Sequence, residues 1–206
     1  MAAPSRPLSP GAQPVGLRER KKLKTRAAIR EATYRLIDEQ GYEATTIEQI
    51  AEAAEVSPST VFRYFASKED IVLTDAYDPV MEALLRGRPA DEAPLESVRV
   101  MMREALTTFL ATDDGELRRR TRLMVEVPAV RARMTETMSE TARDLARVLA
   151  DRTGHDPDDL RVRVFVAAVL GALREATLHW AESGQKGSLP DLVDEALDVL
   201  GGGLRL

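Results

Sequence analysis

The chain has 206 residues, a formal net charge of −5, no cysteine and an aromatic content of only 4%. The lack of cysteine excludes disulfides, thiolate metal sites and a cysteine nucleophile, and it is compatible with a reducing cytoplasm. The negative net charge argues against a protein that coats nucleic acid nonspecifically. Helix-forming residues dominate and alternating β-branched runs are missing, so we expect an all-α protein, with a small unit joined to a larger helical body.

The N-terminal region combines a proline-rich start with a basic run. Residues 1–16 contain four prolines and lack the apolar core of a signal peptide, so we expect a disordered tail there and no membrane span later in the chain. From Leu17 to Arg26, six basic residues stand against the single acid Glu19, a local charge of +5. Such a cluster, which includes Arg18 and Lys22, can attract phosphate or can simply be the solvated start of a helix.

The first helix is predicted from Leu17 to Gln40. Its apolar residues fall at positions 29, 32, 36 and 37, which is the stripe of an amphipathic helix, and Gly41 supplies a left-handed stop. A second helix follows, because Thr45 or Thr46 can form a capping box with an acid or amide three residues later.

This second helix can run for about two turns before the segment Glu55-Val56-Ser57-Pro58. Ser57 suits an N-cap and Pro58 the first turn of a third helix, in which Val61 and Phe65 pack inward. Ser67 is expected to cap a fourth helix that begins near Lys68.

Beyond the fourth helix, proline, glycine and aspartate clusters divide the chain into about five further helices. The expected breaks lie at Pro79, 87–94, Asp113-Asp114-Gly115, Pro128, 153–157 and 183–190. The segment from Leu160 to Trp180 is the most apolar and should be deeply buried or shared with a partner. The last helix is expected from Leu189 to Leu200.

Two short helices joined by a tight turn are typical of a helix-turn-helix whose second helix enters the major groove. Over about Leu17 to Ala76 the sequence resembles the TetR family of transcriptional regulators, in the pattern Gly41-Tyr42-x-x-Thr45-Thr46-Ile47-x-x-Ile50-Ala51 and then Val56-Ser57-x-Ser59-Thr60-Val61-Phe62-x-Tyr64-Phe65-x-Ser67-Lys68-Glu69. The resemblance implies a helix-turn-helix DNA-binding domain over residues 17–66 and a helical effector-binding and dimerisation domain over residues 67–206.

The same resemblance implies contacts to the DNA backbone. Tyr64 and Lys68 would clamp a phosphate, and Thr46 would present its hydroxyl or amide to another phosphate or act as a helix cap alone. With Arg18 and Lys22, these residues form the expected backbone-binding set.

Residues on the exposed side of the third helix would contact the bases, because their hydroxyls and guanidinium can form hydrogen bonds with base edges. The candidates are Ser57, Ser59, Thr60, Phe62 and Arg63. Phe62 departs from the tyrosine common in the family, so it loses a phosphate hydrogen bond but can meet a thymine methyl. Glu55 stands where the family often has glycine, so a left-handed conformation there would cost about 1 kcal/mol.

The C-terminal half offers apolar and thioether side chains that either line a ligand cavity or form ordinary core. The candidates for effector binding are Met101, Met102, Leu106, Phe109, Met124, Met138 and Phe165. The run from Tyr64 to Leu73, with Tyr77-Asp78-Pro79 after it, is similar to an actinobacterial branch of the family that includes the mycofactocin-associated regulator, which answers to acyl-CoA. Arginines 118, 119, 120 and 122 could meet a CoA phosphate or form a solvated face.

Two other classes of protein fit the sequence less well. An enzyme is disfavoured because His155 and His179 have no partners at metal-ligand spacing and no phosphate loop or nucleophile motif is present. A protein-binding helical adaptor would ignore DNA at physiological salt. We therefore expect a cytoplasmic, ligand-responsive regulator, most often a repressor, that binds a palindromic double-stranded DNA operator. It should form a homodimer through its last two helices and need no cofactor, metal or membrane.

Overall fold

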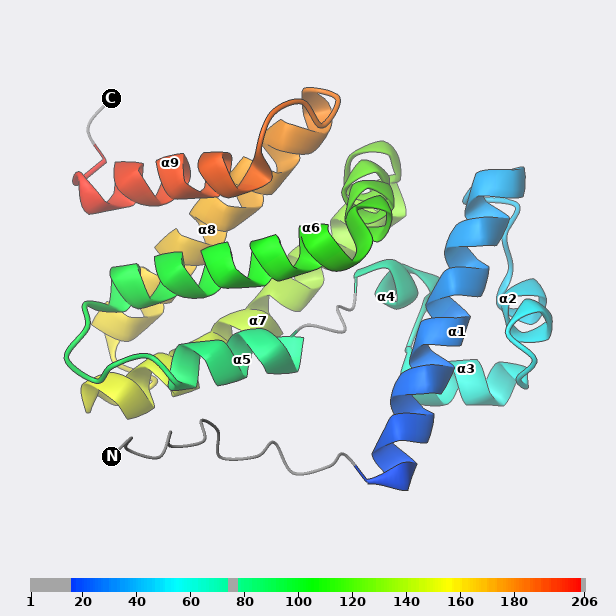
Figure 1. Ribbon diagram of the computed structural model, residues 1–206, viewed down its shortest axis with the longest axis horizontal. Helices are drawn as coiled ribbons and strands as arrows, with labels where there is room; N and C mark the ends of the chain where they lie inside the picture. Colours follow the sequence, from blue (N-terminus) through cyan, green and yellow to red (C-terminus); the bar gives the residue numbers. More distant parts are fainter. Residues whose placement is uncertain (1–15, 74–77, 205–206) are drawn as a thin grey trace, which may run out of the picture.

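The computed structural model describes residues 16–73 and 78–204, so almost all of the expected tail over residues 1–16 lies outside the described residues. Every regular element within the described part is an α-helix, as predicted (Figure 1). The N-terminal helices are α1 (Leu17–Gln40), α2 (Ile47–Ala53), α3 (Pro58–Tyr64) and α4 (Lys68–Leu73). The C-terminal helices are α5 (Asp78–Arg86), α6 (Pro94–Glu126), α7 (Pro128–Thr153), α8 (Leu160–Glu182) and α9 (Leu189–Gly201).

The first three helices form a small unit around a compact core. Ile29 of α1, Ile50 of α2 and Val61 of α3 are each fully buried, and Phe65 and Ile71 complete the cluster. The inward packing predicted for Val61 and Phe65 is confirmed. Since so few side chains hold α2 and α3 against α1, each of them contributes strongly to the position of α3.

The end of α1 differs slightly from the prediction. Gly41 has the expected positive φ of 86°, but its ψ of 162° is extended rather than left-handed helical. The chain therefore leaves α1 sharply, and Tyr42 turns back into the protein, where it is 7% exposed. This exit brings the start of α2 close to α4.

The larger unit is a bundle of α5 to α9 around one extensive core. Trp180, Val166 and Val169 of α8 are almost fully buried there, as is Leu197 of α9. In Figure 1, α6 runs along the bundle between α9 above it and α5 below it, and α7 and α8 pass behind. This core surrounds the cavity described below.

The expected break at Asp113-Asp114-Gly115 is wrong, because α6 continues through it from Pro94 to Glu126. Asp114 accepts a hydrogen bond from Arg118 Nε at 2.7 Å, a pairing across one helical turn. Phe109 and Leu117 are buried on either side of the glycine. Their burial offsets the cost of about 1 kcal/mol that a glycine imposes on a helix interior.

A second cluster joins the two units. Tyr34 and Ile37 of α1 and Val72 of α4 pack against Leu123 of α6 and Val130 of α7. The short helix α4 thus lies between α1 and the bundle (Figure 1). It gives Ile71 to the small core and Val72 to this joining cluster.

Helix α8 is long and apolar enough to cross a membrane by length and composition, and it is the one described helix that passes this test. Its buried residues nevertheless pack within the bundle, on α6, α7 and α9. Buried core helices of proteins outside membranes pass the same test.

Candidate nucleic-acid interface and ligand cavity

A reciprocal capping box fixes the start of α2. The amide of Gln49 donates to Thr46 Oγ1 at 3.3 Å, and the Thr46 amide donates to Gln49 Oε1 at 2.9 Å. The structure thus selects Thr46 over Thr45, whose buried hydroxyl donates to the Gly41 carbonyl at 2.8 Å. Thr46 itself is exposed at the beginning of α2.

The turn between α2 and α3 depends on a left-handed residue. Glu55 has a φ of 53°, which is the conformation expected to carry strain in a residue other than glycine. Beside it, the Val56 amide donates to the Ala51 carbonyl at 2.9 Å and closes the end of α2. The side chain of Glu55 is exposed, so the carboxylate itself is not desolvated.

Three hydroxyls gather at the start of α3. Ser57 Oγ accepts the Thr60 amide at 3.2 Å, which confirms Ser57 as the N-cap. The same oxygen lies 2.9 Å from Ser59 Oγ and 2.9 Å from Thr60 Oγ1. Hydroxyls can both donate and accept, so this cluster can exchange its internal bonds for bonds to a ligand.

The remaining outward residues of α3 are aromatic and basic. Phe62 is 54% exposed, although it is a large apolar side chain, and Arg63 is also exposed. The guanidinium of Arg63 stacks 5.4 Å from the centre of the Tyr64 ring. Tyr64 packs against the small core, while its hydroxyl has no hydrogen-bond partner among the described residues.

Lys68 occupies a position that the sequence did not reveal. Its ammonium donates to the Tyr42 carbonyl at 2.7 Å and to the Thr45 carbonyl at 2.9 Å, and it lies 4.0 Å from the centre of the Tyr42 ring. The Tyr42 hydroxyl donates to Glu69 Oε1 at 2.6 Å. Lys68 and Tyr42 therefore tie the loop before α2 to the start of α4.

The Tyr42 hydroxyl and the Glu69 carboxyl influence each other's pKa. Burial raises the pKa of the Tyr42 hydroxyl, and the hydrogen bond to Glu69 raises it further. Burial also acts to raise the pKa of Glu69, but the Tyr42 hydrogen bond, hydrogen bonds from Ser67 and its own amide, and the Lys68 charge outweigh it. The pKa of Glu69 thus lies below its ordinary value.

The start of α1 carries the basic run that the sequence indicated. The side chains of Arg18, Arg20, Lys21, Lys22 and Lys24 are all exposed. Together with the outer side of α3, they give the N-terminal unit exposed cations and hydrogen-bonding groups. These are the chemical groups that bind the phosphates and base edges of duplex DNA.

One ion pair links the small unit to the bundle with both carboxylate oxygens engaged. Arg133 of α7 donates from Nε to Asp70 Oδ1 at 2.7 Å and from Nη2 to Asp70 Oδ2 at 3.1 Å. The Asp70 residue is 8% exposed. A more exposed pair, Arg122 with Asp38 at 3.1 Å, links α6 to α1.

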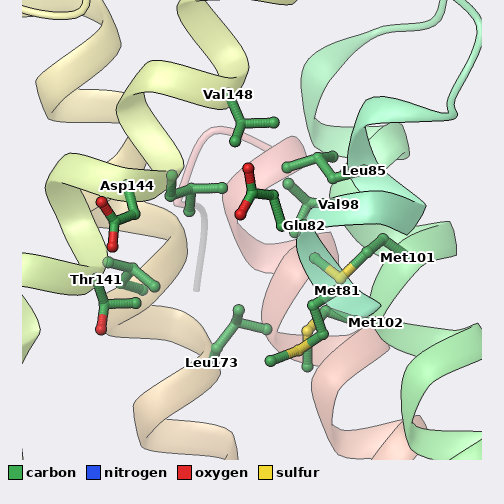
Figure 2. A pocket seen from close by; sticks show the side chains of 12 residues that line it. Met81, Glu82, Leu85, Val98, Met101, Met102, Thr141, Asp144, Val148 and Leu173 are labelled. Atoms are coloured by element: carbon green, nitrogen blue, oxygen red, sulfur yellow. The ribbon is translucent and has the colours of Figure 1, made fainter. Parts of the chain in front are cut away.

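The bundle contains a cavity of about 410 Å³ between α5, α6, α7 and α8. Figure 2 shows Met81, Met101 and Met102 on one side, facing Thr141 and Asp144 on the other. The rest of the wall is aliphatic except for Glu82, whose carboxylate lies among these side chains in Figure 2. This volume is within the range typical of small-molecule sites.

The seven residues expected to bind the effector are not brought together. Met102 lines the cavity, as Met101 does, whereas Leu106 and Phe109 are in the surrounding core. Phe165 packs on that core, Met124 belongs to the cluster that joins the two units, and Met138 is half-buried on α7. The sequence-based reasoning missed Met81 and most aliphatic residues of the wall, because helical periodicity alone does not distinguish a cavity wall from filled core.

The arginines considered for CoA phosphate binding make other contacts. Arg118 pairs with Asp114 and stacks 5.1 Å from the Trp180 ring centre, and Arg122 pairs with Asp38. The Arg119 guanidinium lies 5.4 Å from the ring centre of Tyr34. None of arginines 118, 119, 120 and 122 is part of the cavity wall.

Comparison with known families gives two matches along the chain. Residues 29–74 match the family described as bacterial regulatory proteins of the tetR family. Residues 92–205 match the MftR C-terminal domain of TetR-type proteins. The first match contains the end of α1 with α2 to α4, and the second contains α6 to α9.

Curated relatives and a solved structure agree with these matches. The chain is 40% identical to the HTH-type transcriptional regulator TcmR of Streptomyces glaucescens over 173 residues, which are 80% of this chain and 76% of the relative. It is 27% identical to the putative mycofactocin biosynthesis transcriptional regulator MftR of Mycobacterium tuberculosis, over 85% of this chain and 89% of the relative. The structure of Bacillus subtilis FadR in complex with stearoyl-CoA superposes with a TM-score of 0.58 at 23% identity, over 87% of this chain and 99% of that one, and this likeness shows the fold.

Proposed function

Because the chain belongs to the TetR family of bacterial transcriptional regulators, we propose that it is a repressor that binds a palindromic DNA operator as a homodimer. In this proposal a small molecule bound in the bundle releases the DNA. The family consists of regulators rather than enzymes, so the chain is a ligand-responsive transcriptional regulator and not an enzyme. The expected cytoplasmic location follows from this role.

The outer side of α3 carries the proposal for DNA binding. It carries the exposed Ser57 and Ser59 hydroxyls, the half-buried Thr60, the Arg63 guanidinium and the Phe62 ring on a helix of suitable length to enter a major groove. The hydroxyls and the guanidinium would bond base edges, and Phe62 would contact a thymine methyl. Base identity would thus be read by α3.

The neighbouring residues would hold the DNA backbone. The unpartnered Tyr64 hydroxyl would donate to a phosphate, and Thr46 would do so from the start of α2. Lys68 uses two of its three donors on loop carbonyls, which leaves one for a phosphate. Arg18 and Lys22 would add phosphate contacts from the start of α1.

The proposal of a homodimer is supported by the exposed side of α8. Leu160 is 73% exposed and Val164 is 58% exposed, and Ala167 and Ala168 follow on the same side of the helix. An apolar stripe of this kind on the surface is typical of an interface between proteins. Pairing of α8 and α9 across a two-fold axis would cover it and would place two α3 helices in successive major grooves, about 34 Å apart.

The cavity between α5 and α8 is the proposed effector site. Helix α7 supplies part of its wall and also carries Arg133, which holds Asp70 next to the DNA-binding helices. A ligand that favours another position of α7 would shift the population toward dimers whose α3 helices no longer match the operator. The proposed boundaries are 17–66 for DNA binding and 67–206 for effector binding and dimerisation.

Selection of bound sequences from a random DNA pool would identify the operator, and a mobility-shift assay would then test the interface. We expect the double variant Tyr64→Ala/Lys68→Ala to lose operator binding, and Tyr64→Phe to weaken binding by about tenfold or more, since a hydrogen bond to a charged group contributes about 1.5–3 kcal/mol. Lys186→Ala, which removes an exposed cation from the loop after α8, is the control and should bind normally.

Because Lys68 also holds two loop carbonyls, the helix content and thermal melting of each variant must be measured beside its DNA binding. Tyr64→Phe keeps the ring and the core packing, so it isolates the hydroxyl. Unchanged operator affinity in the folded double variant would rule out this surface as the DNA contact.

A further inference from the structure

The wall of the cavity has an uneven charge. Glu82 of α5 and Asp144 of α7 contribute carboxylates, and Thr141 contributes a hydroxyl, but no lysine, arginine or histidine is found among the described residues that line the cavity. The remaining lining residues are apolar, and three of them are methionines. A ligand in this cavity therefore meets an apolar, adaptable wall with negative groups and no positive ones.

Both carboxylates retain an oxygen for a ligand. Glu82 uses Oε1 with Arg86 Nε at 2.9 Å, and Asp144 uses Oδ1 with Arg147 Nη1 at 2.8 Å. The other oxygen of each carboxylate makes no hydrogen bond or ion pair within the described part of the chain. Neither arginine is among the residues of the wall.

We infer that the effector is an organic cation, with a protonated amine that meets Glu82 and Asp144 and an apolar body that packs on the methionine side. This inference rests on the proposed role of the cavity as the effector site. In Figure 2, the two carboxylates and the methionines lie around the same space, so one ligand of moderate size can contact both kinds of group. Methionine side chains adapt to flat or irregular apolar bodies.

The charge of the wall also disfavours anionic ligands. A carboxylate or phosphate beside Glu82 and Asp144 would be repelled by these two charges, and none of the described lining residues carries a positive charge to offset the repulsion. A fatty acid or an acyl-CoA with its phosphates inside this cavity therefore fits the wall poorly.

A matched series of fluorescent probes tests the inference on the full-length protein. Aminomethylanthracene, hydroxymethylanthracene and anthracene carboxylate share one aromatic body and are cationic, neutral and anionic at neutral pH. We expect the amine to bind at least about tenfold more tightly than the alcohol, and the carboxylate most weakly. Equal affinities, or a preference for the carboxylate, would overturn the inference.

Two pairs of substitutions test whether the preference for the amine over the alcohol depends on the two carboxylates of the cavity wall. Glu82→Gln with Asp144→Asn removes both charges and should bring the amine to the affinity of the alcohol, without weakening the alcohol. The control pair, Asp91→Asn with Glu104→Gln, removes two exposed carboxylates outside the wall and should keep the preference. Retention of the preference in the first pair would overturn the inference, and both pairs should fold because exposed ion pairs add little stability.

Leu173→Trp fills part of the cavity and should weaken all probes, so binding that survives it takes place elsewhere and counts against the inference. Operator binding is measured on the same preparations without ligand. A protein that binds its operator but shows no preference for the amine keeps the proposed regulatory function and loses only the cationic effector. A protein that prefers the amine but does not bind any operator loses the proposed function instead.

Discussion

The DNA-binding helices and the helix bundle use their cores in opposite ways. In the small unit, a few buried residues such as Ile50 and Val61 hold α3 so that its functional side chains point outward. In the bundle, a much larger core encloses a cavity, and the proposed functional surface is internal. The proposed function of the small unit therefore depends on the position of one helix, α3. The proposed function of the bundle depends on where its packing leaves a cavity.

The strongest test of this contrast removes one large side chain from each region. Ile50→Ala and Leu85→Ala should each lower the free energy of unfolding by about 2–5 kcal/mol. Ile50 is fully buried in the small core, so its loss should release α3 and sharply weaken operator binding. Leu85 is 2% exposed and lines the cavity, so its loss should change ligand affinity and leave operator binding intact.

Thermal melting, mobility-shift assays and probe titrations of the two variants provide the comparison. Equal losses of operator affinity in both variants would contradict the separation of the two regions.

The next effect concerns the connection between the regions. Asp70→Asn removes the charge that holds Arg133, so α7 and α4 should become energetically less dependent on each other. The ratio of ligand affinities with and without operator should fall toward one, from the value of about 5–150 that coupled sites commonly have. Operator affinity without ligand should change little, since Asp70 is not one of the proposed DNA contacts.

Titration of a ligand against the protein, free and bound to DNA, measures this ratio. Arg122→Gln breaks the more exposed pair with Asp38 and should lower the ratio less. A wild-type ratio in Asp70→Asn would show that coupling follows another route.

The smallest expected effect on stability comes from a substitution in the loop before α2. In the native protein the pKa of Glu69 is depressed, so its stabilising contribution is present above the ordinary pKa of glutamate and is lost as the pH falls through the depressed value. Tyr42→Phe removes a hydrogen bond that causes this depression, at a cost of about 1 kcal/mol near neutral pH. Urea unfolding at neutral and acidic pH should show a difference from the native protein that shrinks as Glu69 becomes protonated. A difference independent of pH would contradict this account.

Predictions from short sequence patterns were confirmed where they concern a helix N-cap. The N-cap Ser57 and a capping box at Thr45 or Thr46 follow from chemistry within four residues along the chain, and the structure decided for Thr46 with Gln49. The left-handed Glu55 was expected from the family resemblance and is confirmed. The break predicted at Gly115 is wrong because burial on both sides of this glycine, which a local pattern does not reveal, keeps α6 continuous. Lys68 was predicted as a phosphate contact, but its bonds to loop carbonyls depend on residues more than twenty positions earlier.

The sequence by itself determined the all-α class, the helix-turn-helix and its exposed residues, because caps, turns and helical periodicity are short-range effects. Only the tertiary structure decided where the cavity lies, which charges line it, and that Asp70 and Arg133 connect the two units. The physical reason is that a cavity is the space that side chains from four separate helices leave unfilled. Their relative positions arise from packing across the whole bundle and not from any one segment.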